Sequence, residues 1–169
     1  RAENTSTKAF KDWFGDSKVV DKNGDPLVVY HGTQEVKRGV EIQDGKARQV
    51  DPELGFNVFN MPSDGFELGS HFGTEKQAKK FGPAFPFYLS IKNPLRLPDL
   101  GTWNYQSVMR EAMSEGVKIT EAEYNSVFDA RDNNAALRNL LERKGFDGVV
   151  YKNMLEGKGD SYITFRPEQ

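Results

Sequence analysis

The stretch VVYHGTQ, residues 28–34, places one of the chain's two histidines at the end of an apolar, β-branched run. Such a run is typical of a strand, so we expect His31 to end a strand and Gly32 to follow it directly. The second histidine has a similar setting, because His71 in LGSHFGTEKQ is also followed closely by a Gly-Thr pair. Two histidines in matching surroundings call for a common explanation.

The residues upstream of this run predict a helix and then a turn. KAFKDWFGDS, residues 8–17, carries aromatic residues at helical spacing, and Gly15 stands where the helix should stop. We expect this short amphipathic helix to cover the core. The Asn-Gly-Asp-Pro sequence at 23–26 separates two β-branched runs and favours a turn, so we expect these runs to pair as a hairpin.

Downstream of His31, residues 32–55 are polar, contain glycine and are only weakly periodic. This pattern predicts a long loop, and a loop of that length inside a compact domain is usually functional or mobile. FNVF at 56–59 is expected to be a short strand.

A helix should begin just past His71. Thr74 and Gln77 have the spacing of a capping box, and we expect Ala78 and Phe81 on the inner face of the helix that follows. This places His71 at a junction between a strand and a helix.

The second half of the chain predicts one strand, three helices and a closing hairpin. FPFYLSIKNPLRL at 85–97 favours a strand with Pro94 at an edge or a break. Three helices are expected. The first lies near 103–115, the second begins at a cap formed by Thr120 with Glu123, and the third covers NNAALRNLLERKG and ends at Gly145. FDGVVYKN and SYITF should then pair as a hairpin, and the irregular order of strands and helices indicates an α+β fold.

Composition narrows the class of protein. The chain has 169 residues, which is enough for one domain with a hydrophobic core, so we expect a single domain over 1–169. Because no initiator methionine is present, we expect this domain to be the C-terminal fragment of a longer protein. Charged residues make up 28% with a net charge of −2, which disfavours a strong nonspecific nucleic-acid binder. The absence of cysteine excludes disulfides and thiolate chemistry, and no apolar run has the length of a membrane span.

The common catalytic signatures are missing, including phosphate-binding glycine loops, HExxH and GxSxG. A metal site at His31 and His71 would need further carboxylate ligands, and neither histidine has a clustered partner in the sequence. Each histidine could instead satisfy a local backbone group at a strand end. A ligand site is the competing interpretation, because Gly32 allows close approach to the backbone while an imidazole bonds a hydroxyl. Tyr30 and Phe72 could be core residues or could stack on a planar ring, and spacing alone does not choose.

At these residues the chain resembles the ADP-ribosyltransferase fold, most closely the ADP-ribosyltransferase-like domains of phage polyvalent proteins and bacterial polymorphic toxins. The resemblance runs through FKDWFGDSKVVDKNGDPLVVYHGT, LGSHFGTEKQAKKFG, FYLSIKNPLRLPDLGTW and LLERKGFDGVVYKNMLEGKGDSYITFRPEQ. It implies two small packed sheets of antiparallel type around an NAD cleft, with flanking helices.

The resemblance also implies roles for individual residues. In the diphtheria-toxin-like and poly(ADP-ribose)-polymerase-like branch, a strand-terminal His-Gly grips nicotinamide and ribose, which His31 and Gly32 would do here, with Tyr30 and Thr33 beside them. His71 stands at the position of the family's stacking tyrosine, with Phe72 next to it, as in the His-His variant seen in RNA 2'-phosphotransferases.

The family's catalytic glutamate has no clear counterpart. Ser161 aligns with it, flanked by Asp160, and both are candidate catalytic residues together with His31 and His71. Asp160 would point to the opposite face of an ideal strand, and its alternative role is to cap the hairpin turn. Glu156 in the preceding loop is a third candidate for the missing carboxylate.

The implied activity is that of a glycosyltransferase acting on NAD as substrate, which releases nicotinamide and transfers ADP-ribose to a protein, RNA or DNA. We expect a bacterial or phage toxin or effector domain, secreted or injected within a larger protein and acting in the cytoplasm of a host or target cell, with an immunity protein as a further partner and no membrane partner. An RNA 2'-phosphotransferase-like enzyme and an inactive NAD-binding module are the alternatives. Four positively charged side chains in the 32–55 loop could bind a pyrophosphate or a nucleic acid, or could be exposed to solvent only: Lys37, Arg38, Lys46 and Arg48.

Overall fold

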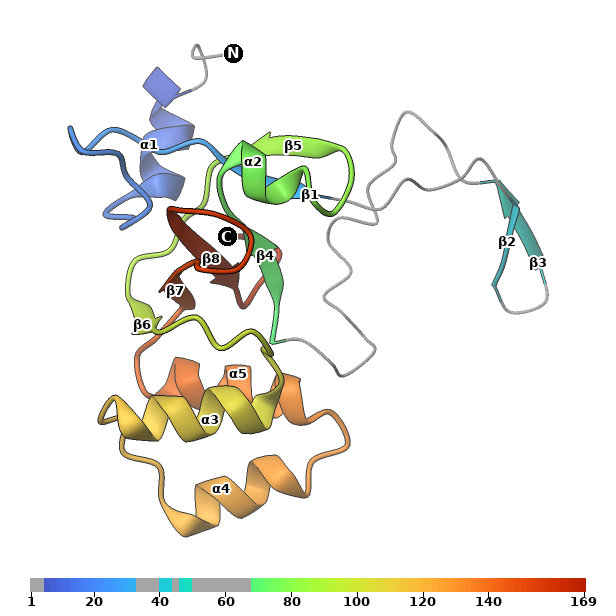
Figure 1. The fold of residues 1–169 in the computed structure, drawn as a ribbon, viewed down its shortest axis with the longest axis vertical. Coiled ribbons are helices and arrows are strands. Elements are labelled where there is room, and N and C mark those ends of the chain that lie inside the picture. Colours follow the sequence, from blue (N-terminus) through green and yellow to red (C-terminus); the bar gives the residue numbers. More distant parts are fainter. Residues whose placement is uncertain (1–4, 33–39, 44–45, 50–67) are drawn as a thin grey trace.

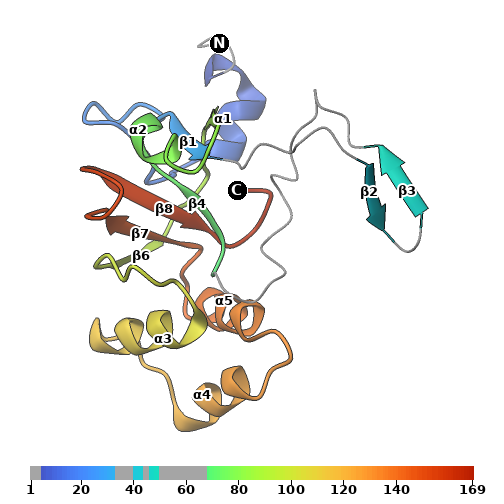
Figure 2. The same cartoon turned by 45° about the vertical axis from the view of Figure 1, so that its right-hand side comes forward.

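A four-stranded sheet occupies the middle of the structure, which is a computed structural model that describes residues 5–32, 40–43, 46–49 and 68–169. A two-stranded sheet with helices α1 and α2 lies on one side of it, and a block of three helices, α3 to α5, lies on the other (Figures 1 and 2). The predicted α+β class is confirmed.

The central sheet has the strand order β4 (Ser70–Phe72), β8 (Asp160–Thr164), β7 (Gly148–Lys152), β6 (Pro94–Leu97). The β7–β8 hairpin is confirmed as an antiparallel pair, and the sheet as a whole is mixed, because β6 runs parallel to β7. A parallel neighbour needs a long connection, which the three helices supply. Pro94 opens an edge strand, where its missing N–H costs no ladder bond.

Both faces of the β7–β8 pair are buried. Val149 and Ile163 pack with helices α3 and α5, whereas Val150 and Tyr162 pack with β1 and the chain before it. Since successive side chains of a strand point to opposite faces, this double burial explains why GVVY is an unbroken apolar run. The motif therefore serves the fold.

Strand β1 (Val29–Gly32) pairs with β5 (Ala84–Phe87), so the second run of the predicted hairpin takes most of its strand partners from later in the chain. The predicted turn does form, because the Asp21 carboxylate accepts the N–H groups of Asn23 and Asp25. Beyond the turn only one bridge, from Val20 to Pro26, joins the two runs. The predicted strand over 85–97 is likewise two strands, β5 and β6.

The helices agree with their sequence signals at most ends. Helix α1 (Lys8–Phe14) ends at Gly15, and α3 (Tyr105–Ser114), α4 (Glu121–Phe128) and α5 (Asn133–Arg143) form the helical block. The Thr120–Glu123 capping box is present. A hydrogen bond from Lys144, reinforced by Thr120, lowers the pKa of Glu123 to about 2.

Helix α2 (Glu75–Ala78) is a single turn with the predicted capping box. Ala78 is buried as expected, but Phe81 is 56% exposed, because the helix ends before it. The expectation that Phe81 packs inward is therefore wrong.

Two short strands interrupt the predicted 32–55 loop. β2 (Val40–Gln43) and β3 (Lys46–Gln49) form an antiparallel pair, so this part of the loop prediction is wrong. Thr33, Lys37, Arg38 and the predicted strand at 56–59 lie outside the described residues. No helix in the described ranges is long and apolar enough to cross a membrane.

Candidate active site

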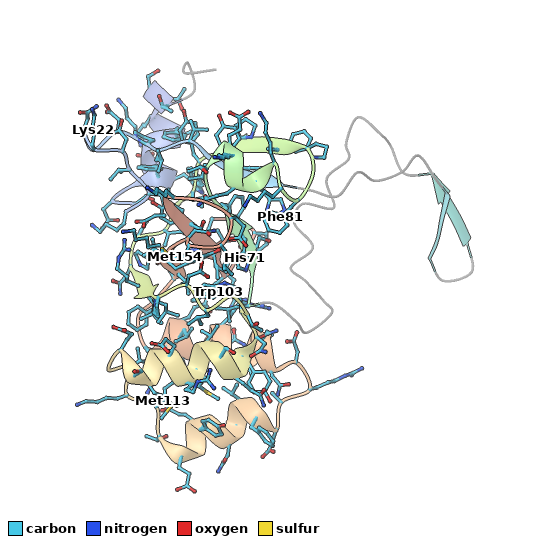
Figure 3. All side chains as sticks on the ribbon, viewed as in Figure 1. Lys22, His71, Phe81, Trp103, Met113 and Met154 are labelled. Atoms are coloured by element: carbon cyan, nitrogen blue, oxygen red, sulfur yellow. The ribbon has the colours of Figure 1, made fainter. Side chains whose placement is uncertain are left out.

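A cavity of about 580 Å³ lies where β1, β4, α2 and the β7–β8 loop meet. This volume is in the range of pockets that hold small molecules. Figure 3 shows His71 between Phe81 and Trp103 in this region. The lining comprises Tyr30, His31, Gly32, Gly69, Ser70, His71, Phe72, Gly73, Gln77, Ala78, Lys80, Phe81, Asp99, Gly101, Trp103, Tyr151, Asn153, Glu156 and Ser161.

The two histidines lie on neighbouring strands. The N–H and C=O of Tyr30 bond the C=O and N–H of Gly73 at 2.8 and 2.9 Å, which joins β1 to the end of β4. Nδ1 of His31 lies 2.6 Å from the backbone oxygen of His71. Because a carbonyl only accepts, Nδ1 of His31 carries the proton, and Nε2 of the neutral ring is an acceptor.

His71 is held by aromatic neighbours. Its Nδ1 lies 3.2 Å from the Tyr151 hydroxyl, and its ring meets Trp103 edge-on with centroids 5.8 Å apart. Burial, and secondly the nearby His31, lower the pKa of His71 to about 4, although Asp99 acts in the opposite direction. At neutral pH the cavity therefore contains an uncharged imidazole at this position.

Gly32 is required by its packing. A Cβ at this position would come within 2.0 Å of the Ala78 carbonyl oxygen, so the end of α2 rests directly on the glycine. Its backbone is also well placed, because alternate residues of a strand direct their N–H and C=O to the same side. The backbone N–H and C=O of Gly32 therefore point to the same side of β1 as those of Tyr30, which bond Gly73 beside the cavity.

Phe72 belongs both to the cavity wall and to the core. It is 5% exposed and packs edge-on against Phe87, and its ring centroid is 5.2 Å from that of His31. The two interpretations of this residue are thus compatible. Tyr30 also lines the cavity, while Thr33 is outside the described residues.

At the far end of the chain, Ser161 lines the cavity and Asp160 does not. The Asp160 carboxylate instead accepts a hydrogen bond from Arg96 on β6 at 2.9 Å, in an exposed ion pair. The two residues are neighbours in β8, so their side chains face opposite ways. Ser161 is buried, accepts a hydrogen bond from Asn153 at 3.0 Å and donates one to Gln77 at 3.3 Å.

Several cavity residues carried no recognisable functional signal in the sequence. Trp103 stands at the start of the helix predicted near 103–115, Asp99 precedes that helix without a signal of its own, and Gln77 predicts only a cap. Asp99 accepts the N–H groups of Gly101 and Met154, and Lys80 bonds the carbonyl of Leu155 at 3.4 Å. Among the described residues, no cluster of three His, Asp or Glu side chains could hold a metal ion.

The fold is that of an ADP-ribosyltransferase domain, since residues 21–169 match the model of a family described as ADP-ribosyltransferase in polyvalent proteins. The match covers most of the chain, so the chain belongs to this family, and the resemblance inferred from the sequence is confirmed. No curated protein and no solved structure matches it.

Proposed function

We propose that this domain breaks the bond between nicotinamide and ribose in NAD and transfers ADP-ribose to a macromolecular acceptor. The observation that carries the proposal is the pair of histidines in one cavity, with the backbone of Gly32 beside them. His31 has its Nδ1–H engaged with the backbone of His71, which fixes its tautomer and leaves Nε2 to accept a ribose hydroxyl.

The chemistry of the cavity suits the nicotinamide end of NAD. The ring carries a positive charge before cleavage, and a neutral His71 avoids repulsion that an imidazolium would cause. The amide of nicotinamide offers one donor and one acceptor side, which matches the N–H and C=O of Gly32. Phe72 and Tyr30 add aromatic surface for a planar ring.

We further propose a toxin or effector role, in which the domain acts in the cytoplasm of a host or target cell on a protein, RNA or DNA, with an immunity protein as a further partner. The second histidine gives some support to the RNA 2'-phosphotransferase-like alternative. The position of Ser161 supports the alternative of an inactive NAD-binding module. The three functions differ in whether nicotinamide is released from NAD and in which molecule receives the ADP-ribose.

The test is incubation with adenine-labelled NAD and a bacterial lysate, followed by protease or nuclease digestion. We expect nicotinamide release and label in a macromolecule, lost to protease if the acceptor is protein and to nuclease if it is nucleic acid. His31→Ala should abolish both signals, whereas Lys118→Ala, an exposed position outside the cavity, should change neither. Wild-type protein that binds NAD without releasing nicotinamide would refute the proposal.

A further inference from the structure

We propose that Glu156, in the loop between β7 and β8, supplies the carboxylate of the reaction, and that Ser161 is a positioning residue for it. The inference rests on the proposed cleavage of NAD. It assigns the carboxylate to a loop residue five positions before the serine that aligns with the family's glutamate.

The reaction needs a negative group and a base. The bond between ribose C1 and the nicotinamide nitrogen breaks with its electron pair going to the ring, so positive charge develops on the ribose. A new bond forms from C1 to the oxygen of an acceptor hydroxyl or of water, and the proton of that oxygen passes to a carboxylate and then to solvent. Ser161 can supply neither the charge nor the base.

Only two carboxylates line the described part of the cavity, Asp99 and Glu156. Both oxygens of Asp99 are occupied, one by the N–H of Gly101 at 3.1 Å and the other by the N–H of Met154 at 2.8 Å. These bonds give Asp99 a structural role in holding two loops. The Glu156 carboxylate, by contrast, accepts no hydrogen bond from any described residue and is half-buried at the cavity wall.

A closed ring of hydrogen bonds fixes the backbone of Glu156. The side-chain oxygen of Asn153 accepts the Glu156 N–H at 2.9 Å, and its amide donates to Ser161 at 3.0 Å. Ser161 donates to Gln77 at 3.3 Å, and Gln77 donates to the carbonyl of Gly157 at 2.9 Å. The peptide groups on both sides of the Glu156–Gly157 pair are thus tied to buried side chains.

The ring is fully desolvated, which makes it rigid. Asn153, Ser161 and Gln77 are each 3% exposed, and a buried polar group without a partner costs about 1–3 kcal/mol. Gly73 packs against the ring, because a Cβ there would lie 2.3 Å from Oε1 of Gln77 and 3.0 Å from Oγ of Ser161. Gly73 therefore leaves room for the hydrogen bond between Ser161 and Gln77, and Ser161 serves to anchor the loop.

The experiment compares nicotinamide release by the wild type with that of Glu156→Gln and of Glu75→Gln, the same substitution on the exposed side of α2. Glu156→Gln should lower kcat about 10²- to 10⁴-fold and change the KM for NAD by less than about threefold, since it removes charge rather than binding surface. Glu75→Gln should match the wild type in both kcat and KM.

The positioning role of Ser161 is tested by a double-mutant cycle. Ser161→Ala should lower kcat at least about tenfold in the wild-type background and have no further effect in the Glu156→Gln background. Equal losses in both backgrounds would show that Ser161 acts independently of Glu156 and would overturn its assignment. Thermal unfolding of each variant separates loss of fold from loss of turnover.

The failures are distinguishable. Absence of nicotinamide release by the wild type would overturn the proposed function and this inference together. Release by the wild type and by Glu156→Gln at similar rates would overturn only the assignment of Glu156. A large kcat loss in Asp99→Asn combined with full activity in Glu156→Gln would move the role to Asp99.

Discussion

The low pKa of His71 in the folded protein should make the domain less stable as the pH falls from about 6.5 to about 4. The pKa of this histidine falls from 6.5 to about 4, chiefly because the ring is buried. In this window the unfolded chain binds a proton that the folded protein does not, so the free energy of unfolding decreases as the pH falls. Below about pH 4 both states are protonated and the decrease stops.

The magnitude follows from the size of the shift. A difference of about 2.5 pKa units at about 1.4 kcal/mol per unit gives about 3–4 kcal/mol, and contact of the ring with water in the cavity reduces this to about 2–3 kcal/mol. Such a loss is a large fraction of the stability of a small domain.

Substitution of His71 by Gln isolates this contribution. Urea unfolding of the wild type and of His71→Gln should be followed by far-ultraviolet circular dichroism, because the fluorescence of Trp103 next to His71 would respond to the charge directly. The difference in unfolding free energy between the two proteins should shrink by about 2–3 kcal/mol from about pH 7 to about pH 4. Other titrating groups are present in both proteins and cancel.

Tyr151→Phe is the matched control. It removes the hydroxyl beside Nδ1 of His71 but retains the titrating ring, whose pKa is lowered by burial and by His31. This variant should keep the pH dependence of the wild type. A difference between wild type and His71→Gln that stays constant across the window would refute the assignment of a low pKa to His71.

Three further predictions concern the fold around the cavity. Ser161→Ala should lower the free energy of unfolding by about 1–3 kcal/mol, because the buried amides of Asn153 and Gln77 lose a hydrogen-bond partner. Asp160→Ala should lower it by less than about 1 kcal/mol, because the ion pair of Asp160 is exposed. Equal thermal midpoints of the two variants would contradict this. Gly32→Ala should lower the free energy of unfolding by about 3 kcal/mol, because its methyl group collides with α2, and it should reduce nicotinamide release. Gly24 has open space around it and a φ of 87°, so Gly24→Ala should lower the free energy of unfolding by only about 1–2 kcal/mol through backbone strain and leave release unchanged. Thr120→Ala should lower stability by about 1 kcal/mol through loss of the α4 cap at full activity, and a loss of turnover would show that α4 matters to the site.

Features set by neighbours in sequence could be predicted. The caps of α2 and α4, the end of α1 at Gly15 and the β7–β8 hairpin depend on residues a few positions apart. The opposite orientation of Asp160 and Ser161 followed from the two-residue period of a strand and agrees with their places in the structure.

Features set by distant partners could not be predicted. The local turn at 23–26 suggested a hairpin, but β1 takes its partner from residues 84–87, and propensity does not encode that choice. Gln77 has a clear capping signal, yet its contacts with Gly157 and Ser161 join residues 80 and 84 positions apart. The reason for Gly32 is similar, since the collision with Ala78 exists only once α2 is in place.

The pairing of β4 with β8 has a consequence for biosynthesis. His71 lies in β4, and the strand beside it in the central sheet, β8, is made of residues 160–164. A nascent chain therefore cannot complete the cavity until these residues have left the ribosome, because long-range strand pairing has to wait for its later partner. A ribosome that stops before residue 160 would release a product in which His31 and His71 are both present but the cavity is incomplete.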